Sequence, residues 1–350
     1  MLKSIFKSIT INLAIVLFFI AVIEIFFGYW FDEDNFGPYM REHRMKNQRI
    51  EYEFNGKKEI YLYRRNYHGF RGKDTDPSKI KAIFMGGSNI EQRYEPEKYT
   101  IIGFLNSNLK KDNSDLEIIN AGVQAMSTRG LIASYKNWLF KLKDFSPKII
   151  LLYVGISDYA LKEEKGLEEQ SYEGNILNHS SVEQIKDNIK SRSILLDSLR
   201  IFKFKYLPRE GFIKYDGNQD PNLKEEFKYK DYSAAIKRFN LRKLKIVHKE
   251  KIINYLKRID KLHELSLQLN STPIFVTNIS AGGFSDIGLV LNFTLIEHCE
   301  KKKYQCIDLA KKLDSNVNYW KDGMHTTQIG SKVIAGIIYK DLNKILYTLN

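Results

Sequence analysis

The sequence predicts an α/β fold built on a parallel β-sheet, and two observations carry this prediction. Short apolar runs recur along the chain and end in small or polar residues, as in 81–85 before Gly86-Gly87. Segments with helical periodicity separate these runs. Apolar runs closed by glycine are typical of strands buried on both faces. Strands that alternate with helices favour a parallel sheet covered by helices on both sides.

Five apolar runs are predicted to form the strands of one sheet, and helical patterns are predicted between them. The predicted strands are 81–85, 116–120, 148–154, 273–277 and 304–309. The predicted helices are 97–110, 128–143, 249–269 and 286–303, followed by an amphipathic helix whose apolar positions run from Ile329 to Leu342. We expect these elements to form a single domain over 80–350.

The N-terminal stretch of about residues 10 to 30 is almost wholly apolar, which is long enough to cross a bilayer as a helix. Lys3 and Lys7 precede it and acidic residues follow it, so the N-terminus is expected in the cytoplasm and the remainder outside. A cleaved signal peptide is the alternative, but no small-x-small cleavage site follows. We interpret 1–31 as an uncleaved anchor, with Glu24 close to its outer end.

Two further segments complete the predicted organisation. Residues 32–79 are a polar and aromatic lead-in, in which alternation around Asn55-Gly56 predicts a hairpin. A loop at 66–72 is compatible with a structural turn or with a role beside the active site. About 160–247 is too long for an ordinary connection and too aromatic for a disordered one, so it is predicted to be a helical cap over the carboxyl ends of the strands.

Composition limits the classes of partner. The chain has 350 residues and a formal net charge of +13, which favours anionic partners. The basic residues are spread along the chain and match no nucleic-acid motif, so a nucleic-acid partner is not expected. Cys299 and Cys306 have no metal-ligand spacing; buried thiols are favoured over a disulfide.

Ser88 is the candidate nucleophile. It is the first polar side chain after the strand that ends in Gly86-Gly87, at the edge where open α/β sheets bind their ligands. Asp322 and His325 stand on one loop before the last helix. An Asp three residues before a His can fix the imidazole tautomer, which leaves the other nitrogen free to take a proton from a serine.

Three groups at the same edge are expected to form an oxyanion hole: the backbone N–H groups of Ser88 and Gly122 and the hydroxyl of Ser157. Taken alone, Gly122 and Ser157 are ordinary strand-end residues. Their coincidence with Ser88 and His325 at one crevice favours the functional interpretation. Candidate substrate-binding residues around this crevice are Asn89, Asp158, Arg71 and Asn278.

The ordered set of motifs resembles the SGNH/GDSL hydrolase family over about 80–345. The motifs are Gly86-Gly87-Ser88-Asn89, Asn120-Ala121-Gly122, Gly155-Ile156-Ser157-Asp158 and Asp322-Gly323-Met324-His325. The resemblance implies a flavodoxin-like three-layer α/β/α fold and ester hydrolysis or acyl transfer. It also implies Ser88 as nucleophile, Gly122 as an oxyanion donor, and His325 and Asp322 as base and orienter. The Gly69-Phe70-Arg71-Gly72 lead-in resembles membrane-anchored bacterial members, which act on envelope glycans.

Two departures from the family pattern stand out. Gly87 precedes the serine where Asp is usual, and Ser157 stands where the family has Asn. Losing one good oxyanion donor costs on the order of 10²–10³ in rate. The leading prediction is an anchored serine esterase or O-acyltransferase acting on a glycan or lipid-linked acyl ester, with a membrane-bound acyl-donor protein as a candidate partner and no metal or cofactor. The alternative is an inactive or weakly active glycan-binding or assembly protein of the same fold.

Overall fold

A computed structural model describes most of the chain. The described residues are 2–28, 30–31, 46–124, 126–158, 161, individual positions between 182 and 202, 213–221, 223, 232–281, 285–313 and 316–349. Most of the predicted cap therefore lies outside the described residues.

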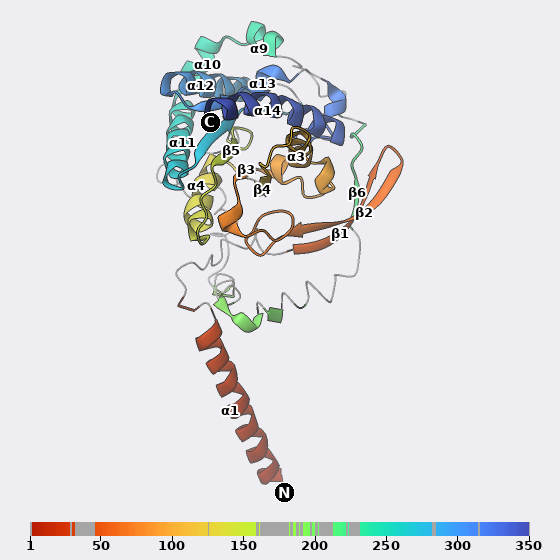
Figure 1. The fold of residues 1–350 in the computed structure, drawn as a ribbon, viewed down its shortest axis with the longest axis vertical. Coiled ribbons are helices and arrows are strands. Elements are labelled where there is room, and N and C mark those ends of the chain that lie inside the picture. The colour runs from red at the N-terminus through yellow and green to blue at the C-terminus, as the bar shows by residue number, and fades with distance from the viewer. Residues whose placement is uncertain are drawn as a thin grey trace.

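A five-stranded, all-parallel sheet forms the centre of the molecule, which confirms the predicted fold class. Its strand order is β4-β3-β5-β7-β8 (Figure 1). The strands are β3 (Ala82–Gly86), β4 (Ile118–Gly122), β5 (Ile149–Tyr153), β7 (Thr272–Val276) and β8 (Gln305–Ile307). The bounds of β3, β5 and β7 each lie within one residue of the predicted ranges. β4 starts and ends two residues later than predicted, and β8 starts one residue later and ends two residues earlier.

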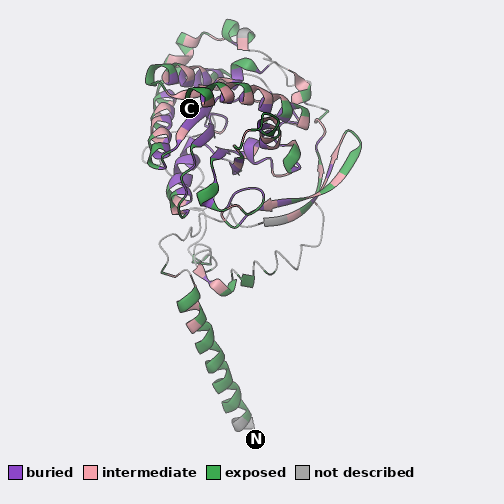
Figure 2. Cartoon of the chain, viewed as in Figure 1, coloured by how far each residue is buried: buried purple, intermediate pink, exposed green. Residues whose placement is uncertain are grey.

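Helices cover both faces of this sheet, and the alternation of side chains along β3 shows why. Ile83 and Met85 face one apolar layer, whereas Ala82 and Phe84 face the other, and all four are buried. The first layer is closed by α4 (Thr128–Asn137), α11 (Lys249–Gln268) and α12 (Asp286–Lys302). The second is closed by α3 (Ile101–Lys111), α13 (Leu309–Lys312) and α14 (Gln328–Leu349). The buried layers lie between the helices and the sheet in Figure 2.

A second, three-stranded sheet has the order β2-β1-β6. β1 (Lys46–Phe54) and β2 (Lys57–Arg65) form the predicted hairpin, and Asn55 and Gly56 at its turn both have positive φ. β6 (Ile213–Asp216) comes from the long insertion and pairs in parallel with β1. The insertion was expected to be helical; its described part also holds this strand, together with α9 (Tyr232–Arg238) and α10 (Leu241–Val247).

The remaining described elements are short. The nucleophile helix α2 is Ser88–Glu91. The chain also has four described single 3-10 turns: η2 (Pro77–Lys79), η3 (Glu97–Tyr99), η4 (Leu139–Lys141) and η5 (Val317–Tyr319).

Helix α1 (Leu2–Phe27) projects away from the rest of the chain and is exposed along its length (Figures 1 and 2). Its segment Ile5–Phe27 is long and apolar enough to cross a membrane. None of its most apolar window is buried against protein.

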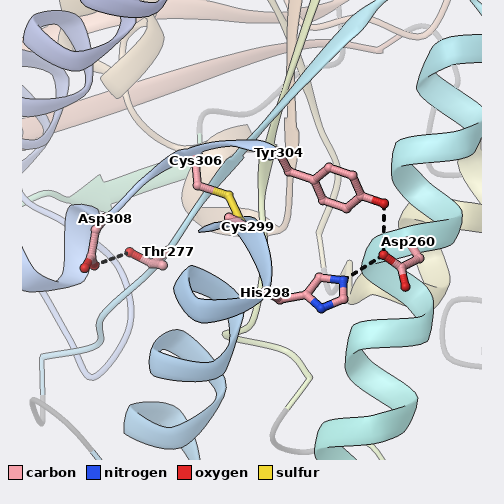
Figure 3. The surroundings of a disulfide bond; sticks show 7 residues. All are labelled: Asp260, Thr277, His298, Cys299, Tyr304, Cys306 and Asp308. Carbon is pink, nitrogen blue, oxygen red and sulfur yellow. Dashed lines mark hydrogen bonds and ion pairs between the residues drawn. A yellow bond between two sulfur atoms is a disulfide. The ribbon is translucent and has the colours of Figure 1, made fainter. Parts of the chain in front are cut away.

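Cys299 and Cys306 are joined by a disulfide, so the prediction of two buried thiols was wrong (Figure 3). The bond links the end of α12 to β8. Beside it, Asp260 accepts hydrogen bonds from the Tyr304 hydroxyl at 3.0 Å and pairs with His298 Nε2 at 2.7 Å. Sequence could not decide the pairing, because it depends on α12 and β8 returning to the same end of the sheet.

Candidate active site

Ser88 stands at the first position of α2, directly beyond the carboxyl end of β3. Gly87 is extended and serves as the N-cap, which turns the chain sharply from strand to helix. The turn requires Gly86, because a Cβ there would lie 2.6 Å from Ile90 Cγ1. The backbone N–H of Ser88 belongs to the first turn of the helix, where N–H groups have no intrahelical acceptor. Ser88 is thus held with both its hydroxyl and its N–H available to a ligand.

The Ser88 hydroxyl lies 2.9 Å from Nε2 of His325. On the other side of the ring, Nδ1 lies 2.9 Å from Oδ2 and 3.1 Å from Oδ1 of Asp322. The structure therefore brings together three side chains from two chain segments far apart in sequence. A carboxylate on Nδ1 holds the proton there and leaves Nε2 as the acceptor facing the serine.

Asp322 is kept ionised by its own loop. Partial burial opposes ionisation, but hydrogen bonds from the His325 ring and from two backbone N–H groups outweigh it and hold the pKa of Asp322 well below its ordinary value. The N–H groups of Met324 and His325 donate to Oδ1 at 2.8 and 2.7 Å. The loop therefore fixes the carboxylate and the imidazole relative to each other before any substrate binds.

Gln92 ties the nucleophile helix to the histidine loop. It follows α2 in a left-handed conformation with φ 43°. Its Nε2 donates to Ser331 Oγ at 2.8 Å and to Thr326 Oγ1 at 3.2 Å, while Oε1 accepts from the N–H of Ile101 at 2.6 Å. Since Thr326 is next to His325, this buried amide sets the separation between the two halves of the site.

Residues of the lead-in segment form hydrogen bonds with Glu91, the last residue of α2. Glu91 is buried and accepts hydrogen bonds from Arg65 at 2.9 Å and from the Tyr63 hydroxyl at 2.8 Å. Burial opposes the charge of Glu91, but Arg65 and Arg93 outweigh this and lower its pKa to about 2. Arg65 also donates to the carbonyl of Gly122 at 2.8 Å. The β2 strand is therefore part of the architecture of the site.

Gly122 does not occupy the place expected of an oxyanion donor. Its N–H donates to Asn120 Oδ1 at 3.0 Å, and it pairs with Gly86 within the sheet. A Cβ at this position would lie 2.3 Å from the backbone nitrogen of Glu91. The glycine is explained by the close approach of α2, and the proposed donor role is withdrawn.

Ser157 lies close to the nucleophile turn. A methyl group placed on Gly87 would be 3.8 Å from Ser157 Oγ and 3.7 Å from the backbone nitrogen of Met126. Ser157 is partly exposed. Ser157 therefore lies close to the residue that precedes Ser88.

The four candidate substrate-binding residues fall into two groups. Asn89 is buried at the base of a cavity that also contains Ser88 and His325. Arg71, Asp158 and Asn278 are buried, do not line that cavity, and are engaged by the protein itself. Their expected contact with substrate is not what the structure shows.

Each of these three residues stabilises a loop. The guanidinium of Arg71 donates to the backbone carbonyls of Glu91, Gln92 and Glu95. Asp158 accepts from the N–H groups of Thr128 and Gly155, each at 3.2 Å. Asn278 donates to the carbonyl of Val154. A buried arginine that binds carbonyls and one that binds a substrate look alike in sequence.

The cavity beside the nucleophile has a volume of about 220 Å³, and part of its wall was not predicted. The ring of Tyr94 stacks on that of Tyr215 with centroids 5.0 Å apart. Lys321 Nζ lies 3.3 Å from the centroid of the Tyr215 ring. Burial lowers the pKa of Lys321 and raises that of Tyr215.

Glu95 also lines this cavity and is 3% exposed. Burial raises its pKa to about 7, although the nearby Tyr52 hydroxyl and the charges of Lys321 and Arg71 act in the opposite direction. Tyr94 and Glu95 could have been suspected, because they follow the nucleophile helix within a few residues. Tyr215 could not, because it reaches the site through the pairing of β6 with β1.

Among the residues that the structure describes, no group of three or more His, Cys, Asp or Glu side chains could hold a metal ion. The polar groups around Ser88 are instead those of a nucleophile, a base and hydrogen-bond donors.

Comparisons with known proteins give similarities of fold only. No family model and no curated protein matches the chain. One similar solved structure is a putative lipolytic protein of the G-D-S-L family from Desulfitobacterium hafniense, with 10% identity, a TM-score of 0.41, and coverage of 75% of this chain and 99% of that one.

Two further similar structures are esterases. The psychrotrophic esterase EstA from Pseudoalteromonas sp. has 11% identity, a TM-score of 0.42, and coverage of 76% of this chain and 99% of that one. An acetyl xylan esterase, AlAXEase, has 12% identity, a TM-score of 0.41, and coverage of 74% and 98%. At these values neither a family nor an activity follows from the likeness alone, and the site must be interpreted from its own geometry.

Proposed function

We propose that this protein is a membrane-anchored serine ester hydrolase or O-acyltransferase that works through an acyl-enzyme. The observation that carries the proposal is the continuous chain of hydrogen bonds from Ser88 Oγ through His325 to Asp322 at the wall of a cavity. Nucleophile, base and orienter in hydrogen-bond contact are what acyl transfer by a serine requires.

In the proposed reaction, Ser88 Oγ attacks the ester carbonyl as His325 Nε2 takes its proton. Asp322 stabilises the imidazolium that forms, since its carboxylate remains ionised and hydrogen-bonded to Nδ1. The imidazolium then protonates the leaving alcohol as the C–O bond breaks. Water, or a hydroxyl of an acceptor, is deprotonated by His325 and releases the acyl group from Ser88.

The negative oxygen of the tetrahedral intermediate is stabilised by the N–H of Ser88 and the hydroxyl of Ser157. Pre-oriented donors are worth more here than in water, because they need not reorganise as the charge develops. With Gly122 removed from this role, Ser157 carries a larger share of the stabilisation than the sequence indicated.

The cavity supports an acylated carbohydrate as the substrate. The ring of Tyr94 lines the cavity beside Ser88, and Asn89, Glu95 and Lys321 offer hydrogen-bonding groups around it. A sugar ring has one apolar face and a rim of hydroxyls, and matches both features. The small cavity favours a short acyl group such as acetyl.

The membrane topology is part of the proposal. With α1 as an uncleaved anchor and its basic end in the cytoplasm, the catalytic domain lies on the outer face of the membrane. The Cys299–Cys306 disulfide supports this location, because disulfides persist in oxidising compartments. There the substrate would be an envelope glycan, and a membrane-bound acyl donor protein would be needed only for the transferase reaction.

The test is hydrolysis of an activated acetyl ester by the full-length protein in detergent micelles. Turnover is expected for the native chain and for Ser78→Ala, a matched control far from the cavity, and is expected to be lost in Ser88→Ala. Turnover that persists in Ser88→Ala would exclude the proposal. Retained cellular function in Ser88→Ala would favour the non-catalytic glycan-binding alternative.

A further inference from the structure

The long insertion exposes a set of large apolar side chains that no described residue covers. They lie between β5 and β6 and are 39 to 59% exposed: Val182, Ile185, Ile189, Leu196, Leu199 and Phe202. The spacings within 182–189 and within 196–202 are three or four residues, as on one side of a helix, and the described helix is interrupted at Ser193 between these two groups. None of them lines the cavity beside Ser88.

This same segment is hydrogen-bonded to the end of the membrane-spanning helix. Ser193 Oγ donates to Glu24 Oε1 at 2.6 Å, and the N–H groups of Ile194 and Leu195 donate to the Glu24 carboxylate at 3.3 and 3.2 Å. Arg192 donates to the carbonyl of Trp30 at 2.7 Å. In Figure 1 the short light-green helical pieces of the insertion lie beside the upper end of α1.

These contacts fix the depth of the segment relative to a bilayer. The apolar stretch Ile5–Phe27 has 23 residues, and as a helix it spans about 34 Å, close to the hydrocarbon thickness of a membrane. Glu24 stands one turn before its end, and the indole of Trp30 donates to it at 2.9 Å. The groups bonded to Glu24 are therefore at the boundary between acyl chains and headgroups.

The charge of the segment suits this position. Between 182 and 202 the sequence has four basic and three acidic residues. Lys186 is exposed beside the apolar side chains. Interfacial helices combine an apolar face with lysine and arginine, which are attracted to anionic headgroups.

We propose that the described residues between 182 and 202 form a second membrane contact, in which their exposed apolar side chains enter the outer boundary of a phospholipid bilayer. The occupant of the face is lipid, because the hydrogen bonds to Glu24 and Trp30 place it where lipid surrounds α1. A single helix lets the attached domain turn freely about its tether. A second contact fixes the height and orientation of the catalytic domain over the membrane surface.

The proposal rests on α1 as the membrane anchor and not on the catalytic assignment, and it is tested by measuring lipid contact at single positions. The full-length protein carries one introduced cysteine with an environment-sensitive fluorophore, in nanodiscs containing phosphatidylglycerol. The test position is Leu199→Cys. The matched control is Ile246→Cys, an aliphatic residue 70% exposed on α10. Figure 1 places α10 at the end of the molecule away from α1.

Lipids with a spin label near the headgroup are expected to quench the probe at 199 at least about twofold and to leave the probe at 246 unchanged. Quenching of the 199 probe by aqueous iodide to the same extent as the 246 probe would overturn the proposal. Shielding from iodide without quenching by the lipid would also overturn it, since protein would then cover the face.

A second variant separates membrane contact from folding. Leu196→Asp combined with Leu199→Asp changes exposed side chains only, and is expected to abolish lipid quenching of a probe at Ile185→Cys. Hydrolysis of a soluble ester should be unchanged, because neither position touches the cavity. Undiminished quenching at 185 in this variant would contradict the proposal.

Discussion

The two sides of Ser88 are built very differently. On the proton-transfer side, His325 is held by Asp322, and Gln92 fixes the distance between the two loops with three hydrogen bonds. On the oxyanion side, Gly122 is engaged by Asn120, and the described donors are one backbone N–H and the short hydroxyl of Ser157. If the proposed reaction is correct, this comparison predicts that proton transfer contributes more to the rate than oxyanion stabilisation.

The largest expected loss follows removal of the base. His325→Ala should lower kcat for an activated acetyl ester by about 10⁴-fold or more, because no other described side chain lies within hydrogen-bond distance of Ser88 Oγ to take its proton. The measurement is steady-state hydrolysis with native-like folding checked by circular dichroism. A decrease in kcat of less than tenfold would show that His325 is not the general base of the reaction.

Replacing the orienter should have a smaller but still large effect. Asp322→Asn keeps the shape of the side chain but removes the charge that stabilises the imidazolium, and is expected to lower kcat by about 10³–10⁴. The KM for the ester should stay nearly constant, since the substrate is not bound by this carboxylate. A raised KM with an unchanged kcat would instead assign Asp322 to binding.

The oxyanion side is tested at Ser157. Ser157→Ala should lower kcat by about 10–100-fold, less than either change on the proton-transfer side, because a single short donor is removed. Ser157→Asn should retain or raise kcat by supplying a longer donor. If Ser157→Ala lowered kcat as much as His325→Ala, the oxyanion side would be as important to the rate as the proton-transfer side, contrary to this prediction.

Gly122→Ala separates packing from catalysis. The added Cβ would lie 2.3 Å from the Glu91 backbone, so we expect a loss of about 1–3 kcal/mol in the free energy of unfolding, measured by urea denaturation. The backbone N–H is kept in this variant. Its kcat per folded molecule should therefore be unchanged, and a fully stable variant would contradict the packing explanation of this glycine.

The smallest effect concerns Glu95 and pH. Burial raises its pKa to about 7, so at intermediate pH the folded protein keeps a proton that the unfolded chain has lost. Binding of this proton contributes to the free energy of unfolding. The contribution is full below the ordinary pKa of glutamate, and it is lost as the pH rises through about 7. Glu95→Gln should therefore gain Tm relative to the native chain as the pH rises from about 5 to about 8. A constant difference in Tm would mean that Glu95 is ionised throughout.

The fold and the triad could be predicted from sequence because their signals are local. The apolar run ending at Gly86-Gly87 places Ser88 at a strand end, and the spacing of Asp322 and His325 places both on one loop. The other parts depend on long-range packing. Tyr215 reaches the cavity only because β6 pairs with β1, and Arg71 turns toward backbone carbonyls because the loop after α2 presents three of them.

The measurement that tests the central claim most directly is the intact mass of the full-length protein after treatment with a fluorophosphonate, followed by peptide mapping. The account predicts one phosphonyl adduct, located on Ser88, and its loss in His325→Ala, because the hydroxyl reacts only when the imidazole takes its proton. An unmodified native protein, or an adduct on another residue, would contradict it.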